Sequence, residues 1–173
     1  MPRVQVLTVI GDDRPGLVEE ISTAITAHQG NWLDSSMSRL AGKFAGVLTV
    51  DVPEEHEAAL LKTLGELGSL RVRAEAAAAA ADSGYGRHLS FSLVGHDRIG
   101  IVREVSQVFA RHGVNVDKLT TWTSSAPMSS DTLFHAEAEL RAADGLDAAA
   151  LKADLERLSN DLIADINLDD RPD

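Results

Sequence analysis

An internal repeat constrains the fold of this chain more than any other feature. Shifting the sequence by 84 residues aligns GDDRPGLVEE, which begins at Gly11, with GHDRIGIVRE, which begins at Gly95. Nine of the twenty-one residues from Gly11 to Asn31 are identical to their counterparts without a gap, far more than unrelated segments share. Because self-similarity at a fixed spacing indicates a duplicated structural unit, the sequence predicts two copies of one fold.

Each copy begins with a strand followed by a helix. The segment VQVLTVI is mostly apolar, as is typical of a central, buried strand. After Gly16, and again after Gly100, apolar residues and one histidine recur with the helical period. They are Leu17, Val18, Ile21, Ala24, Ile25 and His28 in the first copy, and Ile101, Val102, Val105, Val108, Phe109 and His112 in the second. Both histidines lie near a helix end, where we expect them to help cap carbonyl groups.

The remainder of each copy predicts a hairpin, a helix and a strand. The hairpin strands are NWLDSSMSRL and FAGVLTVDV in the first copy, and NVDKLTTWT and DTLFHAEAEL, joined by SSAPMSS, in the second. Leucines at helical spacing follow in each copy. The copies close with the period-two segments LRVRAEA and DLIADINL, which predict strands.

This order of elements predicts an α+β protein made of two ferredoxin-like βαββαβ units, each a four-stranded antiparallel sheet with two helices on one face. We place the domains at residues 1–77 and 87–170. Residues 78–86 form the expected linker, because an alanine run there ends in Asp-Ser-Gly-Tyr-Gly. One face of each sheet is left uncovered, so we expect the units to pair or the chain to form a homodimer.

Composition narrows the classes of partner. The net charge of −11 is shared evenly, with 7 basic and 12 acidic residues in positions 1–86 and 9 and 15 in positions 87–173. Direct nucleic-acid binding is not expected, because it depends on neutralising phosphates with Lys and Arg. The chain has no cysteine, no apolar run of membrane-spanning length and no signal-peptide pattern at its N-terminus. We therefore expect a cytoplasmic protein without membrane contact.

The segment Asp13–Gly16 lies where the first strand gives way to the first helix. Pro15 suits a first helical position, and Gly16 lacks the side chain that would keep a ligand off the backbone. The unpaired N–H groups of a helix start suit a carboxylate, and Asp13 could accept from an ammonium group. This pattern fits a free α-amino acid, and we expect the Asn31 amide to reach the same binding site. Ordinary helix capping by Asp and Pro, with a glycine that relieves crowding, is the competing interpretation.

The motif DRPG at a strand-to-helix turn, with an Asn opening the next strand, resembles the ACT domain, a regulatory module that binds amino acids. Two such units without a catalytic domain resemble the glycine cleavage system transcriptional repressor family. The resemblance implies a sensor of a small amino acid, glycine or serine, that contacts a DNA-binding transcriptional regulator and does not bind DNA itself. It also implies a ligand between two ACT units and eight ligand positions: Asp13, Arg14, Gly16, Asn31, Asp97, Arg98, Gly100 and Asn115.

The second copy departs from this pattern at three positions. Ile99 replaces the proline, His96 replaces Asp12, and the glycine before the asparagine moves from Gly30 to Gly113. These changes leave open whether both sites bind a ligand and which loop faces which asparagine.

Catalysis is not expected from this sequence. The candidates for acid–base chemistry are His96 beside Asp97, His88 and His135, and no nucleophile, phosphate-loop or zinc-protease motif accompanies them. The six histidines lack the close spacing of zinc ligands, so neither a metal nor a cofactor is expected. Two hypotheses remain: an amino-acid sensor, or an adaptor that acts through protein contacts without a ligand.

Overall fold

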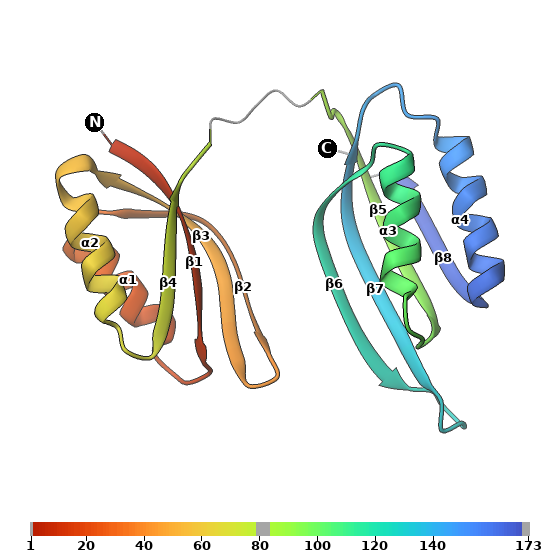
Figure 1. Cartoon of the computed structure of the whole chain (residues 1–173), viewed down its shortest axis with the longest axis horizontal. Coiled ribbons are helices and arrows are strands. Elements are labelled where there is room, and N and C mark those ends of the chain that lie inside the picture. Colours follow the sequence, from red (N-terminus) through yellow and green to blue (C-terminus); the bar gives the residue numbers. More distant parts are fainter. Residues whose placement is uncertain (1, 79–83, 171–173) are drawn as a thin grey trace. The chain divides into compact units, whose positions relative to one another are not determined.

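The chain forms two compact units, drawn in Figure 1. The computed structural model describes residues 2–78 of unit 1 and residues 84–170 of unit 2. The expected linker, residues 78–86, lies mostly outside the described residues, so its bounds remain a prediction.

Unit 1 has the predicted order of elements. They are β1 (Pro2–Asp12), α1 (Leu17–Ala27), β2 (Asn31–Leu40), β3 (Lys43–Pro53), α2 (Glu54–Glu66) and β4 (Leu70–Ala76). The sheet order is β2-β3-β1-β4 with every neighbouring pair antiparallel. The apolar strand β1 is therefore central, as its composition predicted.

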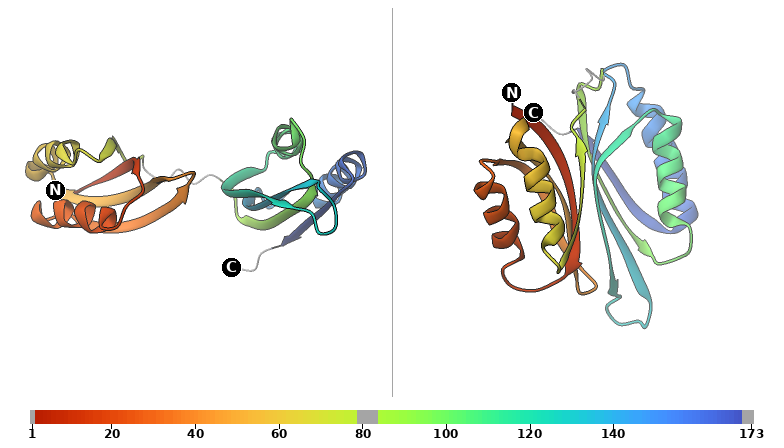
Figure 2. Two further views of the ribbon diagram at one scale, coloured as in Figure 1. Left: turned by 90° about the horizontal axis from the view of Figure 1, so that it is seen from below. Right: turned by 60° about the vertical axis from the view of Figure 1, so that its left-hand side comes forward.

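Unit 2 repeats this arrangement. Its elements are β5 (Arg87–His96), α3 (Ile101–Arg111), β6 (Asn115–Ser125), β7 (Thr132–Ala142), α4 (Ala148–Leu162) and β8 (Ala164–Asp170). The sheet order is β6-β7-β5-β8, again antiparallel throughout. The helices of each unit cover one face of its sheet, as Figure 2 shows, and the predicted α+β ferredoxin-like fold is confirmed.

Each unit has its own core between helices and sheet. In unit 1 it includes Leu7 and Val9 of β1, Ile21 of α1 and Leu64 of α2. In unit 2, Phe91 of β5 meets Phe109 of α3 edge to face, with ring centroids 5.0 Å apart. These side chains come from the period-two strands and the helical stripes of the sequence, so the amphipathic patterns identify the core.

The hairpin turn of unit 1 is tight. Ala41 and Gly42 have φ angles of 48° and 78°, and Leu40 pairs with Lys43 across them. Two consecutive positive φ angles are those of a type I′ turn, which suits the twist of an antiparallel hairpin.

The boundary between α4 and β8 differs from the prediction. The segment DLIADINL was expected to be all strand, but α4 continues through Leu162 and the strand starts at Ala164. Leu162 is buried and continues the leucine stripe of α4, so it satisfies the helical pattern as well as the strand pattern. Ile163 joins the two elements in a left-handed conformation, with φ 50°.

Candidate functional site

The β1–α1 loop opens helix α1 with a glycine in the left-handed conformation. Gly16 is the N-cap with φ 90°, and Gly100 opens α3 with φ 91°. A Cβ at Gly16 would meet nothing within 4 Å, and one at Gly100 would come only to 3.8 Å from Glu104. Relief of crowding is therefore the wrong explanation for these glycines; the positive φ angle requires them.

Ordinary capping does not describe this loop either. Pro15 precedes the N-cap instead of occupying the first helical position, and no described side chain caps α1 or α3 at its start. The carboxylate of Asp13 is instead 2.7 Å from Nε of Arg39. The first-turn N–H groups of α1 point out of the helix start without an intrahelical partner, which gives this end of the helix a positive partial charge.

Arg14 of the β1–α1 loop is held by a carboxylate of helix α1. Its guanidinium contacts Glu20 through two nitrogens, at 2.7 and 2.8 Å, and also donates to Ser69 Oγ at 2.7 Å. The hydrogen bond from Arg14 lowers the pKa of Glu20 below its ordinary value of 4.5. Arg98 repeats the pair, with its guanidinium 2.5 Å from Glu104.

The two glutamates were missing from the predicted ligand residues. Their signal was nevertheless present in the repeat, because an Arg followed six residues later by a Glu occurs identically in both copies. The identity of Glu20 with Glu104 marks the partner of each loop arginine.

Main-chain hydrogen bonds fix the loop to the neighbouring hairpin. The N–H of Asp13 donates to the carbonyl of Gly42 at 3.0 Å, and the N–H of Asp97 donates to the carbonyl of Thr132 at 2.9 Å. A hollow of about 280 Å³ opens at this end of unit 1, lined by residues 10–12, Lys43 and residues 68–71. Its lining does not include Asp13, Arg14 or Gly16, so these predicted ligand residues border the hollow without forming it.

The asparagines lie at the other end of each sheet. In unit 1, Asn31 pairs with Asp51, which pairs with Val4 near the start of β1, whereas Asp12 at the end of β1 pairs with Lys43. At about 3.3 Å per residue, the strand separates these two ends by roughly 26 Å. The expectation that Asn31 and Asp13 of one unit contribute to the same binding site is therefore wrong.

Unit 2 separates its residues in the same way. Asn115 pairs with Arg141, which pairs with His88 at the start of β5. The Asn115 amide donates to Asp117 at 2.7 Å, and Arg141 Nε lies 2.5 Å from the same carboxylate. Asp97 and Asn115 are thus not brought together within unit 2.

The two histidines near the ends of α1 and α3, His28 and His112, have structural partners. His28 Nδ1 is 2.8 Å from the carbonyl of Ala24, as expected for a histidine that caps a helix end. His112 differs, since its Nε2 contacts Asp154 of α4 at 2.7 Å. The hydrogen bond from His112 lowers the pKa of Asp154.

Of the histidines considered for catalysis, His135 has a partner that the sequence did not reveal. Its Nε2 is 2.7 Å from Ser124 Oγ, and its ring stacks on Trp122 with centroids 5.0 Å apart. Within residues 2–78 and 84–170, no group of three or more His, Asp or Glu side chains is arranged to hold a metal ion.

Comparison with known proteins gives the same description to both units. Residues 4–71 match one family model described as an ACT domain, and residues 90–158 match a second with the same description. A UPF0237 protein from Methanopyrus kandleri is 47% identical over 49 residues, which are 28% of this chain. The match spans about half of that relative, 54% of its length.

Two solved structures resemble the whole chain. An unknown protein from Galdieria sulphuraria has a TM-score of 0.86 and 26% identity, over 99% of this chain and 100% of that one. A provisionally assigned glycine cleavage system transcriptional repressor has a TM-score of 0.73 and 19% identity, over 100% of this chain and 99% of that one. At that identity the second likeness supports the fold alone. None of the described helices is long and apolar enough to cross a membrane.

Proposed function

The chain belongs to the ACT domain family, with two ACT domains in tandem, and from this premise we propose that it is an amino-acid-sensing regulatory protein without catalytic activity. The observation that carries the proposal is the loop that both units retain. Each combines a left-handed glycine, an uncapped helix start and an arginine held by a glutamate six residues later. A duplicated site with duplicated geometry fits one class of ligand.

The proposed ligand is a small free amino acid, with glycine or serine favoured. Its carboxylate would meet the first-turn N–H groups of α1 or α3, which carry the positive end of the helix dipole. Its ammonium group would take the place of Arg39 at Asp13, since the two cations compete for one carboxylate. A side chain larger than that of serine would crowd a site built this close to the backbone.

A second ACT unit completes the proposed site. Because Asp13 and Asn31 are at opposite ends of one sheet, a ligand that contacts both kinds of residue has to lie between the loop of one unit and the asparagine of another. An antiparallel arrangement of two units supplies this geometry. The domains proposed for this role are residues 1–77 and 87–170, joined by the linker at residues 78–86.

The proposed output is contact with a DNA-binding transcriptional regulator in the cytoplasm, as repression of glycine cleavage genes would require. The acidic composition supports a role in which the partner, and not this chain, binds DNA, since a net charge of −11 opposes direct binding to nucleic acid. The likeness to the provisionally assigned repressor supports it through the shared fold.

One observation favours a second candidate, an adaptor that needs no ligand. Asp13 and Arg14 already have partners in Arg39 and Glu20, so the loop of unit 1 is satisfied without an amino acid. In that case the sheet faces and edges would act through protein contacts.

Thermal unfolding of the full chain with each of the twenty amino acids separates the two candidates. A ligand at about a hundred times its dissociation constant adds roughly 2.7 kcal/mol, a shift of a few degrees. The sensor predicts a shift with a small amino acid that Asp13→Ala reduces. Arg39→Ala is the matched control, because it breaks the same ion pair and leaves Asp13 free for the ligand. No shift with any of the twenty would favour the adaptor.

A further inference from the structure

Unit 1 exposes an apolar sheet face. Helices α1 and α2 cover one face of its sheet, and alternation along β1 and β3 places Val4, Ile10 and Val47 on the other, here called the open face of unit 1. These three side chains are 41%, 46% and 43% exposed. Ala45, paired with Ile10, extends the apolar surface between the two central strands.

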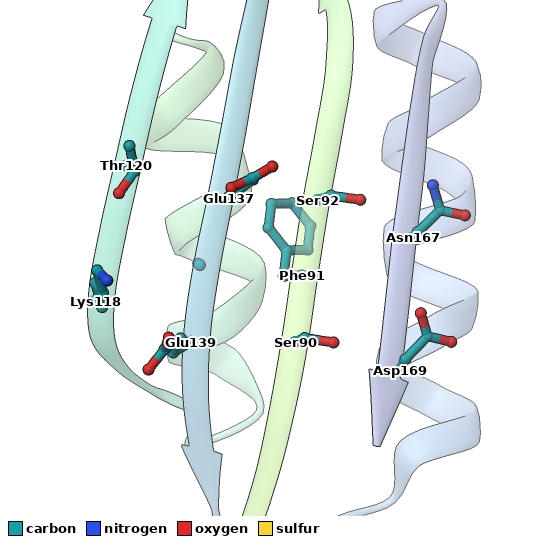
Figure 3. A pocket seen from close by; sticks show the side chains of 10 residues that line it. Ser90, Phe91, Ser92, Lys118, Thr120, Glu137, Glu139, Asn167 and Asp169 are labelled. Atoms are coloured by element: carbon teal, nitrogen blue, oxygen red, sulfur yellow. The ribbon is translucent and has the colours of Figure 1, made fainter. Parts of the chain in front are cut away.

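The repeat supplies an internal comparison, because unit 2 has His88 and Glu137 at the positions of Val4 and Val47, although Val94 matches Ile10. In unit 1, Thr8 pairs with Val47, whereas in unit 2 the corresponding Ser92 pairs with Glu137. Figure 3 shows Glu137, Ser92 and Asn167 in one row across the bare face of this sheet. The fold therefore does not require apolar residues at the positions of Val4 and Val47, and their presence in unit 1 needs another explanation.

The open face of unit 1 is also electrically balanced. Arg71 and Arg73 of β4 lie on it with Glu75, and Asp51 of β3 lies on it as well. With the paired Asp12 and Lys43, three cations and three carboxylates of β1, β3 and β4 leave these strands without net charge on this face, in a chain whose total charge is −11. Two copies can therefore approach through this face without the repulsion that acts between the chains as a whole.

The bare face of unit 2 is less suited to self-association, because carboxylates outnumber cations on it. Its bare face carries Glu137 and Glu139 of β7 and Asp165 and Asp169 of β8, against Lys118 and Arg141. Figure 3 shows most of these groups around a shallow depression of about 400 Å³. Packing two such faces together would bring carboxylates against carboxylates, which is unfavourable.

Arg71 and Glu75 of β4 can pair with each other across a two-fold axis, while Arg73 between them is already paired with Glu75 of its own strand. Arg71 and Glu75 lie on either side of Arg73 on the same face, and Arg73 Nε is 3.3 Å from Glu75. A two-fold axis that crosses the strands at Arg73 places Arg71 of one copy over Glu75 of the other, and the reverse. The same axis brings the apolar centre of one face onto that of the other.

We propose that the open face of unit 1 is a self-association surface, which packs against the same face of a second copy of this chain. The contact is isologous, with an apolar centre of β1 and β3 side chains and Arg71–Glu75 ion pairs at the β4 edge. This contact does not require a bound amino acid, so it can be tested independently of the proposed function.

The repeat offers a matched pair of variants for the test. Ile10 and Val94 are equivalent, 84 positions apart, and both are exposed on the bare face of their unit. Sedimentation equilibrium of the full chain at about 1–100 µM, without amino acid, is expected to show a dimer. Ile10→Glu should weaken it by about 100-fold or more, because the dimer would bury each unpaired carboxylate among the apolar side chains of the other copy, whereas Val94→Glu should leave the dissociation constant within about threefold.

Three results would overturn the proposal: a monomeric wild-type chain at about 100 µM, equal effects of both substitutions, or a larger effect of Val94→Glu. A monomer would also be the result if unit 2 or a foreign protein covered this face. Circular dichroism at the same concentrations checks that each variant is folded.

A charge exchange tests the two-fold arrangement if Ile10→Glu does not fold. Arg71→Glu should weaken the dimer by about tenfold at low salt, and adding Glu75→Arg should restore at least half of the lost free energy of association. Failure of the double variant to recover would exclude the arrangement in which Arg71 faces Glu75.

Discussion

Asp13 and Asn31 lie at opposite ends of the first sheet, with most of the length of β1 between them. The chain passes through α1 between the two residues, and the helix returns it to the end of the sheet from which β1 started. An amino acid bound at the loop therefore cannot reach the asparagine of the same unit. Binding through both requires two units, and this requirement makes the asparagines a direct test of the site.

Asn31→Ala and Asn115→Ala should each weaken amino-acid binding, provided that both sites bind. Only Asn31→Ala should leave the ligand-free chain as stable as before, because Asn115→Ala also removes the hydrogen bond that Asn115 donates to Asp117. Asn31 is exposed, so the loss is confined to the hydrogen bond with the ligand, about tenfold in affinity. Isothermal titration calorimetry with the amino acid found by thermal unfolding measures the effect. Asn167→Ala, on the bare face of unit 2, is the control. Unchanged affinity in both variants would remove the asparagines from the site.

Gly16→Ala should destabilise unit 1 by about 1–2 kcal/mol, because a side chain at φ 90° strains the backbone even where space is available. Gly65→Ala should do the opposite and stabilise by about 0.5–1 kcal/mol, since Gly65 lies within α2 and a Cβ there also meets nothing within 4 Å. Urea denaturation measures both changes. Effects of the same sign would mean that the dihedral angle is not what requires Gly16.

The Arg14–Glu20 pair should stabilise unit 1 only where Glu20 is ionised. The arginine lowers the pKa of Glu20 from its ordinary value of 4.5, so the contribution is full above that value and disappears as the pH falls through the lower, folded-state value. Glu20→Gln should therefore be less stable than wild type at about pH 7, and the deficit should shrink progressively as the pH falls below the ordinary pKa of 4.5. Urea denaturation at several pH values measures this difference.

The neighbouring Glu19→Gln controls for the loss of a first-turn carboxylate near the helix dipole. A Glu20→Gln deficit that persists unchanged at low pH would show that the ion pair is not its source.

Local patterns predicted most of the fold because the same residues determine element type and core. Leu7 and Val9 alternate with exposed neighbours in β1, and Ile101 and Val105 recur at helical spacing in α3, so period and burial agree. The sequence could not place the end of α4, because Leu162 fits both a helical stripe and an alternating strand.

The site was predicted less completely than the fold. The DRPG motif and its repeat DRIG located the loop and the glycine of each unit, but not the left-handed conformation that requires the glycine. The partner of Asp13 was not predictable, because Arg39 lies on the far arm of the hairpin and only the folded sheet brings it near. The position of Asn31 could have been deduced from the predicted topology, although we expected it beside Asp13, since a helix between two parallel strands returns the chain to the end where the first strand began.

Ile163→Gly should stabilise unit 2. Ile163 closes α4 with φ 50°, a conformation that costs a β-branched residue about 1–2 kcal/mol and that glycine adopts freely. Its side chain is 80% exposed, so little burial is lost with it. We expect a gain of about 1 kcal/mol, seen as an upward shift of roughly 4–8 °C in the thermal midpoint of a unit of this size.

Ile163→Ala distinguishes relief of the backbone from loss of an exposed apolar side chain. Alanine lacks the branch at Cβ but still strains at positive φ, so its gain should be clearly smaller than that of glycine. Equal midpoints for the two variants would assign the effect to the side chain. A destabilised glycine variant would mean that Ile163 makes a stabilising contact in solution, and the exposed end of α4 would then be a surface that a partner covers.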